Sequence, residues 1–192
     1  MKRSLFFLAM MVATPFAHAT IITYSANLSG SNESPTNASP GTGSALVTID
    51  DVLNTMTVDV TFSGLIGTTT ATHIHCCTAS PLTGTAGVAT TTPTFAGFPL
   101  GVTSGTYFNV LDMTQATSYN PSFVTANGGT ITGAEAYLLN GMSLSESYLN
   151  IHTTFRPGGE IRGFLTQVPE PATLALLCFG LVGLGWSRHK KV

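Results

Sequence analysis

Positive charge is scarce in this sequence. Only 8% of the 192 residues are Asp, Glu, Lys or Arg, and every lysine lies within the first three or the last three positions. Between residues 20 and 168 the chain has two basic residues, Arg156 and Arg162, against eight acidic ones, which gives this segment a formal charge of −6. Such a segment is unsuited to holding nucleic acid or anionic lipid by charge. The sequence therefore predicts no nucleic-acid partner.

Cysteine is almost as scarce. Cys76 and Cys77 are adjacent, and Cys178 lies in an apolar run near the C-terminus. Adjacent cysteines cannot connect distant parts of a fold, which excludes a disulfide-stapled scaffold. In an exported chain the pair can form a vicinal disulfide, bond to another molecule or stay reduced, and a thiolate can also bind a metal ion. The sequence leaves these alternatives open.

The common catalytic motifs are also missing. The sequence contains no G-x-S-x-G elbow, no glycine-rich phosphate loop and no H-E-x-x-H motif. Its adjacent carboxylates, Asp50 and Asp51, fall where a turn is expected. Aspartate is common in turns because its side chain hydrogen-bonds to the local backbone. We therefore expect a protein without enzymatic activity.

The N-terminal end carries the pattern of a targeting segment. Residues 1–19 begin with Lys2 and Arg3, continue with a short apolar run and end with small residues. This order is typical of a cleaved signal peptide, and the alternative is an uncleaved N-terminal helix. The apolar run is too short for a stable membrane anchor. The sequence therefore predicts an exported protein whose mature chain begins at residue 20.

The C-terminal end, residues 168–192, combines three features in a fixed order. Pro169, Glu170 and Pro171 precede an apolar run at 172–186, and a basic end follows. As a transmembrane helix the run would be about 22 Å long, short of a hydrocarbon core of about 30 Å. The order resembles the PEP-CTERM sorting tail of Gram-negative bacteria, and the alternative is an ordinary membrane anchor. The resemblance implies an exosortase-type partner, a transient or stable anchor in the inner membrane, and a final position at the cell surface or outside the cell.

Residues 20–167 are expected to form one domain with its own core. Short runs of alternating polarity, separated by Gly, Pro and Asn, are typical of antiparallel strands. The fold class predicted is all-β, an antiparallel sandwich or barrel with one short helix, at 131–140. The expected strands are 21–29, 44–50, 55–62, 71–77, 87–90, 107–111 and the two arms of a hairpin within 148–165, with a helical turn at 121–126.

The hairpin at 148–165 carries polar residues that could act chemically. An odd-length loop centred on Pro157 sets His152 opposite Arg162 and gathers the apolar side chains of both arms on the other face. An even-length loop would mix polar and apolar residues on both faces, which a buried face disfavours strongly. In the odd register Glu160 and Arg162 become candidates for an ion pair or an anion site.

Three histidines occur in the predicted domain, His73, His75 and His152. His73 and His75 are two residues apart, so on a strand both side chains point to one face. If the strand of His152 lies beside theirs, the three imidazoles could bind zinc or copper with a fourth position open. Cys77 has the parity of the two neighbouring histidines and is the candidate sulfur ligand. The alternative, without a metal ion, is a hydrogen-bonded network with the polar residues of the hairpin.

Two blocks of sequence resemble the CHRD domain, a module named after the developmental protein chordin and also found in exported bacterial proteins. One block is H-I-H at 73–75, and the other comprises YLNIHT at 148–153 and GGEIRG at 158–163. The resemblance spans about residues 22–166. It implies an extracellular, mostly β module, immunoglobulin-like or barrel-like, with no established enzymatic activity. Cys76-Cys77 departs from the glycine-rich segment that often follows the first histidine pair.

Two functions from different classes are expected. The first is a non-enzymatic protein of the cell surface or extracellular matrix that acts as a binding or scaffold module, with an extracellular polysaccharide or another surface protein as its partner. The second is a mononuclear copper or zinc protein that uses His73, His75 and His152. That arrangement is similar to the copper half of copper–zinc superoxide dismutases, and this resemblance implies a superoxide-dismutase-like barrel as the other candidate for the fold. A dinuclear dismutase would need more histidines than the domain supplies.

Overall fold

The computed structural model describes residues 20–169. The predicted signal peptide, residues 1–19, and the predicted transmembrane segment, residues 172–186, lie outside the described residues. So do Glu170 and Pro171 of the sorting motif. Within residues 20–169, no helix is long and apolar enough to span a membrane.

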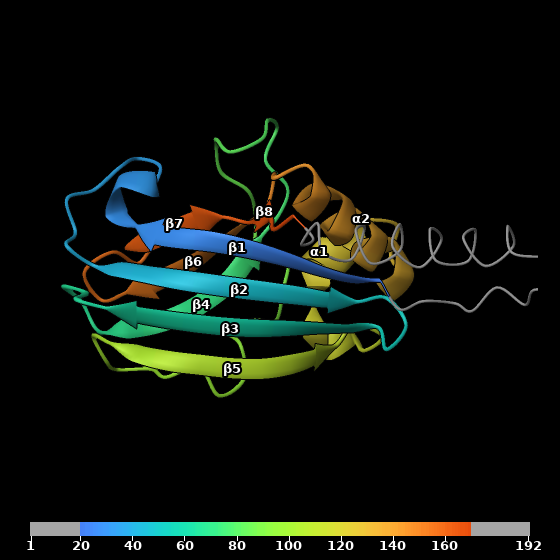
Figure 1. The fold of residues 1–192 in the computed structure, drawn as a ribbon, viewed down its shortest axis with the longest axis horizontal. Coiled ribbons are helices and arrows are strands. Elements are labelled where there is room, and N and C mark those ends of the chain that lie inside the picture. The colour runs from blue at the N-terminus through green and yellow to red at the C-terminus, as the bar shows by residue number, and fades with distance from the viewer. Residues whose placement is uncertain (1–19, 170–192) are drawn as a thin grey trace, which may run out of the picture.

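The described chain is built on one antiparallel sheet. Its strands are β1 (Ile21–Ser29), β2 (Thr42–Asp50), β3 (Thr55–Ser63), β4 (Thr69–His75), β5 (Gly105–Asp112), β6 (Tyr148–Thr153), β7 (Ile161–Phe164) and β8 (Thr166–Gln167). Seven of them follow the order β4-β6-β7-β1-β2-β3-β5, and β8 pairs with β1. The sheet curls so that β4 and β6 lie behind the strands β1, β2, β3 and β5 (Figure 1). The antiparallel β class is therefore confirmed, in the form of a half-barrel made from a single sheet.

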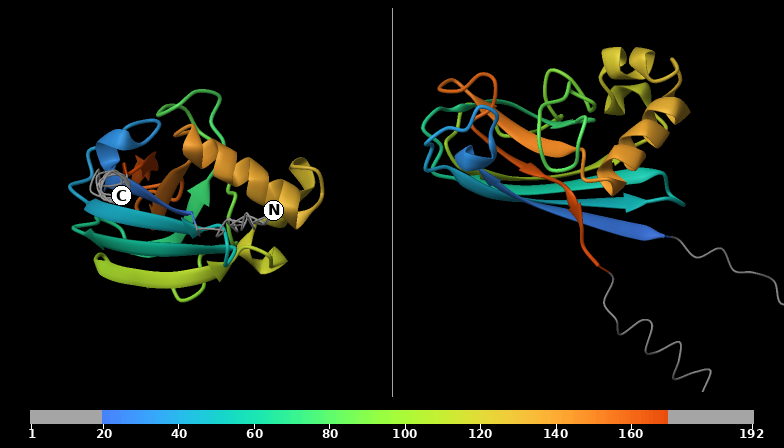
Figure 2. Two further views of the ribbon diagram at one scale, coloured as in Figure 1. Left: turned by 45° about the vertical axis from the view of Figure 1, so that its right-hand side comes forward. Right: turned by 90° about the horizontal axis from the view of Figure 1, so that it is seen from above.

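Two short helices, where the sequence predicted one helix and a helical turn, gather at one end of the sheet (Figure 2). They are α1 (Pro121–Ala126) and α2 (Ile131–Ser143), and 3-10 turns occur at Gly30–Asn32 and Ala116–Ser118. Thr130 caps α2 by accepting the Gly133 N–H. The helix predicted at 131–140 continues past Gly141 to Ser143. A side chain at Gly141 would collide with the Cys77 sulfur, so this glycine is needed for packing and does not end the helix.

The core lies inside the curl of the sheet. In β3 the residues alternate between buried and accessible positions, as the alternating polarity of the sequence predicted. The inward side chains of β3 meet those of the strands behind, and all are 2% exposed or less: Met56, Val58, Val60, Phe62, Ile74, Leu149, Ile151 and Ile161. The predicted strand at 87–90 is wrong, because this segment makes only isolated bridges at Val88 and Thr90.

The connection that leads into β5 covers the outer edge of β4. The Thr72 N–H donates to the Thr94 hydroxyl, and the Phe95 N–H donates to the Thr72 carbonyl. Further along, the Thr69 N–H donates to the Val102 carbonyl. An unpaired strand edge invites pairing with other chains, and these bonds remove that opportunity from β4.

The hairpin of β6 and β7 has the predicted faces but a different register. Asn150, and not His152, lies opposite Arg162, which is a shift of two residues. The physical reason is that the residues after β6 bond elsewhere: the Thr154 N–H donates to the Thr68 carbonyl instead of across the hairpin. A shift of two preserves the side on which each residue points, so the predicted apolar face survives.

Glu160 lies in a buried position at the turn of this hairpin. Its carboxylate accepts hydrogen bonds from the hydroxyls of Ser39 and Thr153 at 2.6 Å each, and from the N–H groups of Ile66 at 2.6 Å and Gly67 at 3.1 Å. Burial acts to raise the pKa of Glu160, but these four donors outweigh it and lower the pKa. The carboxylate therefore connects three separate segments of the chain.

We expect Glu160→Gln to lower the free energy of unfolding by about 2–4 kcal/mol. The amide nitrogen would replace an acceptor oxygen and face groups that can only donate or already donate. Urea unfolding of both proteins measures the difference. Asp59→Asn removes the same charge at an exposed position of β3 and should change stability by about 0.5 kcal/mol or less. A Glu160→Gln protein as stable as wild type would contradict this role.

Candidate functional site

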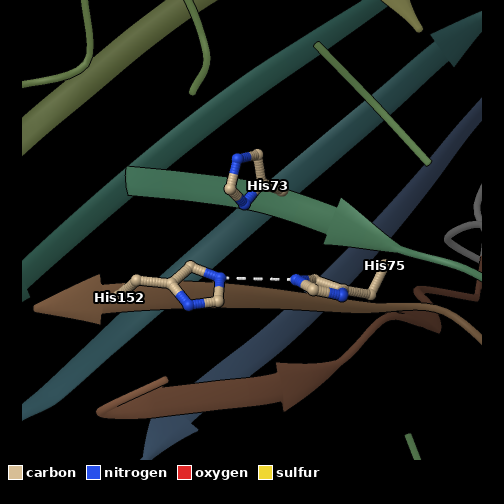
Figure 3. A group of neighbouring side chains, drawn as sticks. All are labelled: His73, His75 and His152. Carbon is tan, nitrogen blue, oxygen red and sulfur yellow. Dashed lines mark hydrogen bonds between the residues drawn. The ribbon is translucent and has the colours of Figure 1, made fainter. Parts of the chain in front are cut away.

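The pairing of β4 with β6 brings the three predicted histidines together. The two strands are antiparallel, with Ala71 opposite His152, and His73 and His75 follow along β4 on the same face. The imidazoles of His75 and His152 face one another, and that of His73 lies beside them (Figure 3). The ring centres are 5.2–5.9 Å apart. The adjacency required for a three-histidine site is therefore present.

The histidine face is buried, although it points away from the apolar core. His73, His75 and His152 are only 6%, 8% and 9% exposed. As the sequence predicted, the three histidines lie on the polar side of the sheet. This side is not exposed, because segments that are distant in the sequence cover it. The backbone of the β4–β5 connection and of the hairpin loop contacts the three rings.

Each ring has one nitrogen bound to a backbone carbonyl. A carbonyl can only accept, so that nitrogen carries the proton, and the tautomer of each neutral imidazole is fixed. The three donations are from His73 Nε2 to Pro93 at 2.6 Å, from His75 Nδ1 to Ala86 at 2.9 Å and from His152 Nδ1 to Pro157 at 2.9 Å.

The second nitrogen of each ring then presents a bare lone pair. His75 Nε2 and His152 Nε2 are 3.4 Å apart, and His73 Nδ1 is buried without a hydrogen-bond partner in the described chain. Two lone pairs cannot hydrogen-bond to each other, so the contact between His75 and His152 needs a proton or a metal ion. One nitrogen from each histidine can be chosen so that all three lie within 4.8 Å of one another.

The local electrostatics keep the imidazoles uncharged. Burial lowers the pKa of all three histidines. For His75 burial lowers the pKa to about 4; the Ala86 carbonyl opposes this, while His152, His73 and Arg162 add to it by repulsion. Neutral imidazole is the form that binds metal ions. The three rings are therefore in the ligand form at neutral pH.

The two cysteines of the domain take no part in this group. Cys76 and Cys77 form a vicinal disulfide, and the Cys77 sulfur lies near the Tyr137 carbonyl of α2. Cys77 was the predicted sulfur ligand, but its sulfur is bonded to that of Cys76. Among the described residues, the group of potential metal ligands contains only the three histidines, with no cysteine or carboxylate.

Arg162 has partners that the sequence did not predict. Its nearest carboxylate is Glu33, 3.8 Å from Nε, whereas Glu160 is bound to hydroxyl and backbone donors. Burial raises the pKa of Glu33 to about 7, although the charge of Arg162 and the Ser34 N–H partly oppose this. Glu33 lies in a loop without any local signal that marks it. Only the fold reveals its role.

Tyr148 connects Arg162 to the histidine group. Its ring stacks on the imidazole of His75, with centres 4.8 Å apart and planes 6° apart. The Arg162 guanidinium lies 4.6 Å from the centre of the same ring. The alternation of residues in β6 places Tyr148 on the face of His152, so a sequence signal existed. The predicted hydrogen-bonded network between the histidines and the polar side chains of the hairpin is not found. Each imidazole donates to a backbone carbonyl instead.

Without added metal, the protein is expected to lose stability as the pH falls from about 6.5 to about 4. Unfolded histidines titrate near pH 6.5, and the folded ones have lower pKa values, so protons bind the unfolded chain first and favour it. Glu33 contributes to the pH dependence with the opposite sign because its pKa is raised, but it is one group against three imidazoles. Urea unfolding with chelator at about pH 7, 5.5 and 4.5 measures the slope, which His75→Gln should reduce. A flat profile would contradict the assignment.

Two families of known sequences match this chain. The CHRD domain matches residues 24–165, and the PEP-CTERM protein-sorting motif matches residues 167–190. No curated protein and no solved structure matches it. The sorting motif implies an exported cell-surface protein that is processed by an exosortase. The first match covers more than half of the chain and includes all three histidines. The chain therefore belongs to the CHRD domain family and carries a PEP-CTERM sorting motif after the domain.

Proposed function

We propose that this CHRD protein is a non-enzymatic surface module that binds one transition-metal ion through His73, His75 and His152. The observation that carries the proposal is the convergence of three imidazole nitrogens within 4.8 Å. The backbone carbonyls bound to the other nitrogens are the kind of outer partners that orient metal-binding histidines. Imidazole donors suit zinc and copper.

Three details favour a metal site over a purely polar network. The buried His73 Nδ1 has no hydrogen-bond partner among the described residues, which is costly unless another group binds it. The short contact between His75 and His152 joins two lone pairs. Lastly, the pKa values of His75 and His152 are lowered, so at neutral pH a proton shared between these two nitrogens is disfavoured. A metal ion satisfies all three nitrogens at once.

The burial of the group supports a binding role without catalysis. No histidine of the group is more than 9% exposed, which limits the approach of a substrate. A bound ion would connect β4 to β6 and add its binding free energy to the stability of the folded module. This fits a module that works outside the cell as a scaffold or binder. Its macromolecular partner, a polysaccharide or a surface protein, stays a prediction.

The purified exported protein is expected to bind one equivalent of copper or zinc and to melt at a higher temperature when loaded. Removal of a ligand in His152→Ala should weaken metal binding by at least about 100-fold. Elemental analysis after dialysis gives the stoichiometry, and calorimetry with and without chelator gives the stabilisation.

Thr72→Val provides the matched control for that experiment. Its hydroxyl donates to the Asn150 carbonyl across the same strand pair, so the substitution disturbs β4 and β6 without touching an imidazole. It should lower stability but keep the metal stoichiometry. A metal-free wild type whose stability is unchanged by chelator would refute the proposed function.

Sorting can be tested apart from metal binding. Glu170 is the acidic residue of the PEP-CTERM motif, and Glu170→Ala is expected to leave the protein in the inner membrane of a host with an exosortase. Fractionation of cells and immunodetection of the two chain lengths measure the processing. Thr166→Ala, exposed in β8, is the control and should be processed normally. Normal processing of Glu170→Ala would contradict this role for the motif.

A further inference from the structure

The histidine group offers three protein ligands and no charge to balance a metal ion. All three donors are neutral imidazoles, and no carboxylate or thiolate of residues 20–169 belongs to the group. A zinc site in a protein is almost always tetrahedral, with a fourth ligand from the protein or from water. A fourth ligand from solvent would have to enter a group whose members are at most 9% exposed. The donor set therefore favours an ion that is stable when coordinated by only three neutral ligands.

A fixed positive charge, that of Arg162, acts on the histidine group by repulsion. Arg162 is 3% exposed, and its guanidinium lies over the ring of Tyr148, which stacks on the imidazole of His75. Glu33 compensates Arg162 only in part, because the closest approach of the two groups is 3.8 Å. Repulsion from a fixed charge is twice as large for a divalent ion as for a monovalent one at the same place. A buried divalent ion without a counter-charge is also the more costly to desolvate.

We infer that the three-histidine site selects monovalent copper, Cu(I), over divalent zinc. The inference rests on the proposed function, and it names the ion that the function leaves open. Cu(I) has a closed d shell, carries a single charge and forms stable complexes with three neutral nitrogen donors. Arg162, acting across Tyr148, is a positioning charge that sets the preference without touching the metal.

Competition with chelators of known affinity tests the preference on the exported protein at about pH 8. Cu(I) is supplied without oxygen and with ascorbate, which leaves disulfides intact, so that Cys76 and Cys77 do not become ligands. We expect one equivalent of Cu(I), bound at least about 100-fold more tightly than Zn²⁺. Equal or tighter binding of Zn²⁺ would overturn the inference but leave the proposed function standing. Failure to bind either ion would refute the proposed function itself.

Two substitutions with opposite expected signs test the role of charge. Arg162→Met keeps an apolar stem over Tyr148, removes the positive charge and should reduce the ratio of Cu(I) to Zn²⁺ affinity by about tenfold. Glu33→Gln removes the compensating carboxylate, which is largely ionised at about pH 8, and should increase that ratio by a smaller factor. The Glu33 variant keeps the test decisive if Arg162→Met does not fold. A ratio that neither folded variant changes would overturn the electrostatic assignment.

Discussion

The pairing of β4 with β6 is the contact on which the candidate site depends. The strands are far apart in the sequence, and their register places His75 within 3.4 Å of His152. Apolar residues on the opposite face hold that register, with Ile74 opposite Leu149 in the core. A slip by one residue would turn the imidazoles of one strand into the core. A slip by two would keep the faces but change which residues of β4 lie opposite His152. The hydrophobic core therefore sets the geometry of a polar site that it does not touch.

The second requirement is cover. A row of polar side chains on the outside of a sheet would ordinarily face water, and exposed imidazoles would titrate near their usual pKa. Here the β4–β5 connection and the hairpin loop cover the row, and their carbonyls accept the ring protons. These hydrogen bonds also give a partner to loop carbonyls that would otherwise be buried without one. Burial and the direction of the lone pairs thus have a common origin in the loops.

Much of this arrangement could be read from local alternation in the sequence. The parity of residues in 71–75 and 148–153 correctly predicted which side chains share a face, but it did not extend to Cys77, because β4 ends at His75. The choice of an odd loop preserved the apolar face of β6 and β7. The register was wrong by two because Thr154 bonds to Thr68, which no local pattern indicates. Parity is a property of neighbours in the chain, whereas the bonding of a loop depends on segments that are distant in sequence.

Burial and charge partners were harder to predict for the same reason. Nothing near Glu33 in the sequence marks it as the partner of Arg162, and Glu160 seemed the better candidate because it is two residues away. At the turn of the hairpin, however, the Glu160 carboxylate accepts hydrogen bonds from two other segments of the chain, at Ser39 and Ile66. The vicinal disulfide was one of several possibilities for Cys76 and Cys77, and the position of α2 could not be known beforehand.

The carbonyl partners of the three rings have a consequence for how this protein can vary. The groups that fix the ring protons are main-chain carbonyls, at Ala86, Pro93 and Pro157, so these hydrogen bonds do not depend on the side chains at those positions. Two of the three are prolines, whose rings fix φ and so restrict the path of the loop. The covering loops can therefore change much of their surface chemistry, and with it whatever they meet outside the cell, while the buried histidines keep the same protonation pattern.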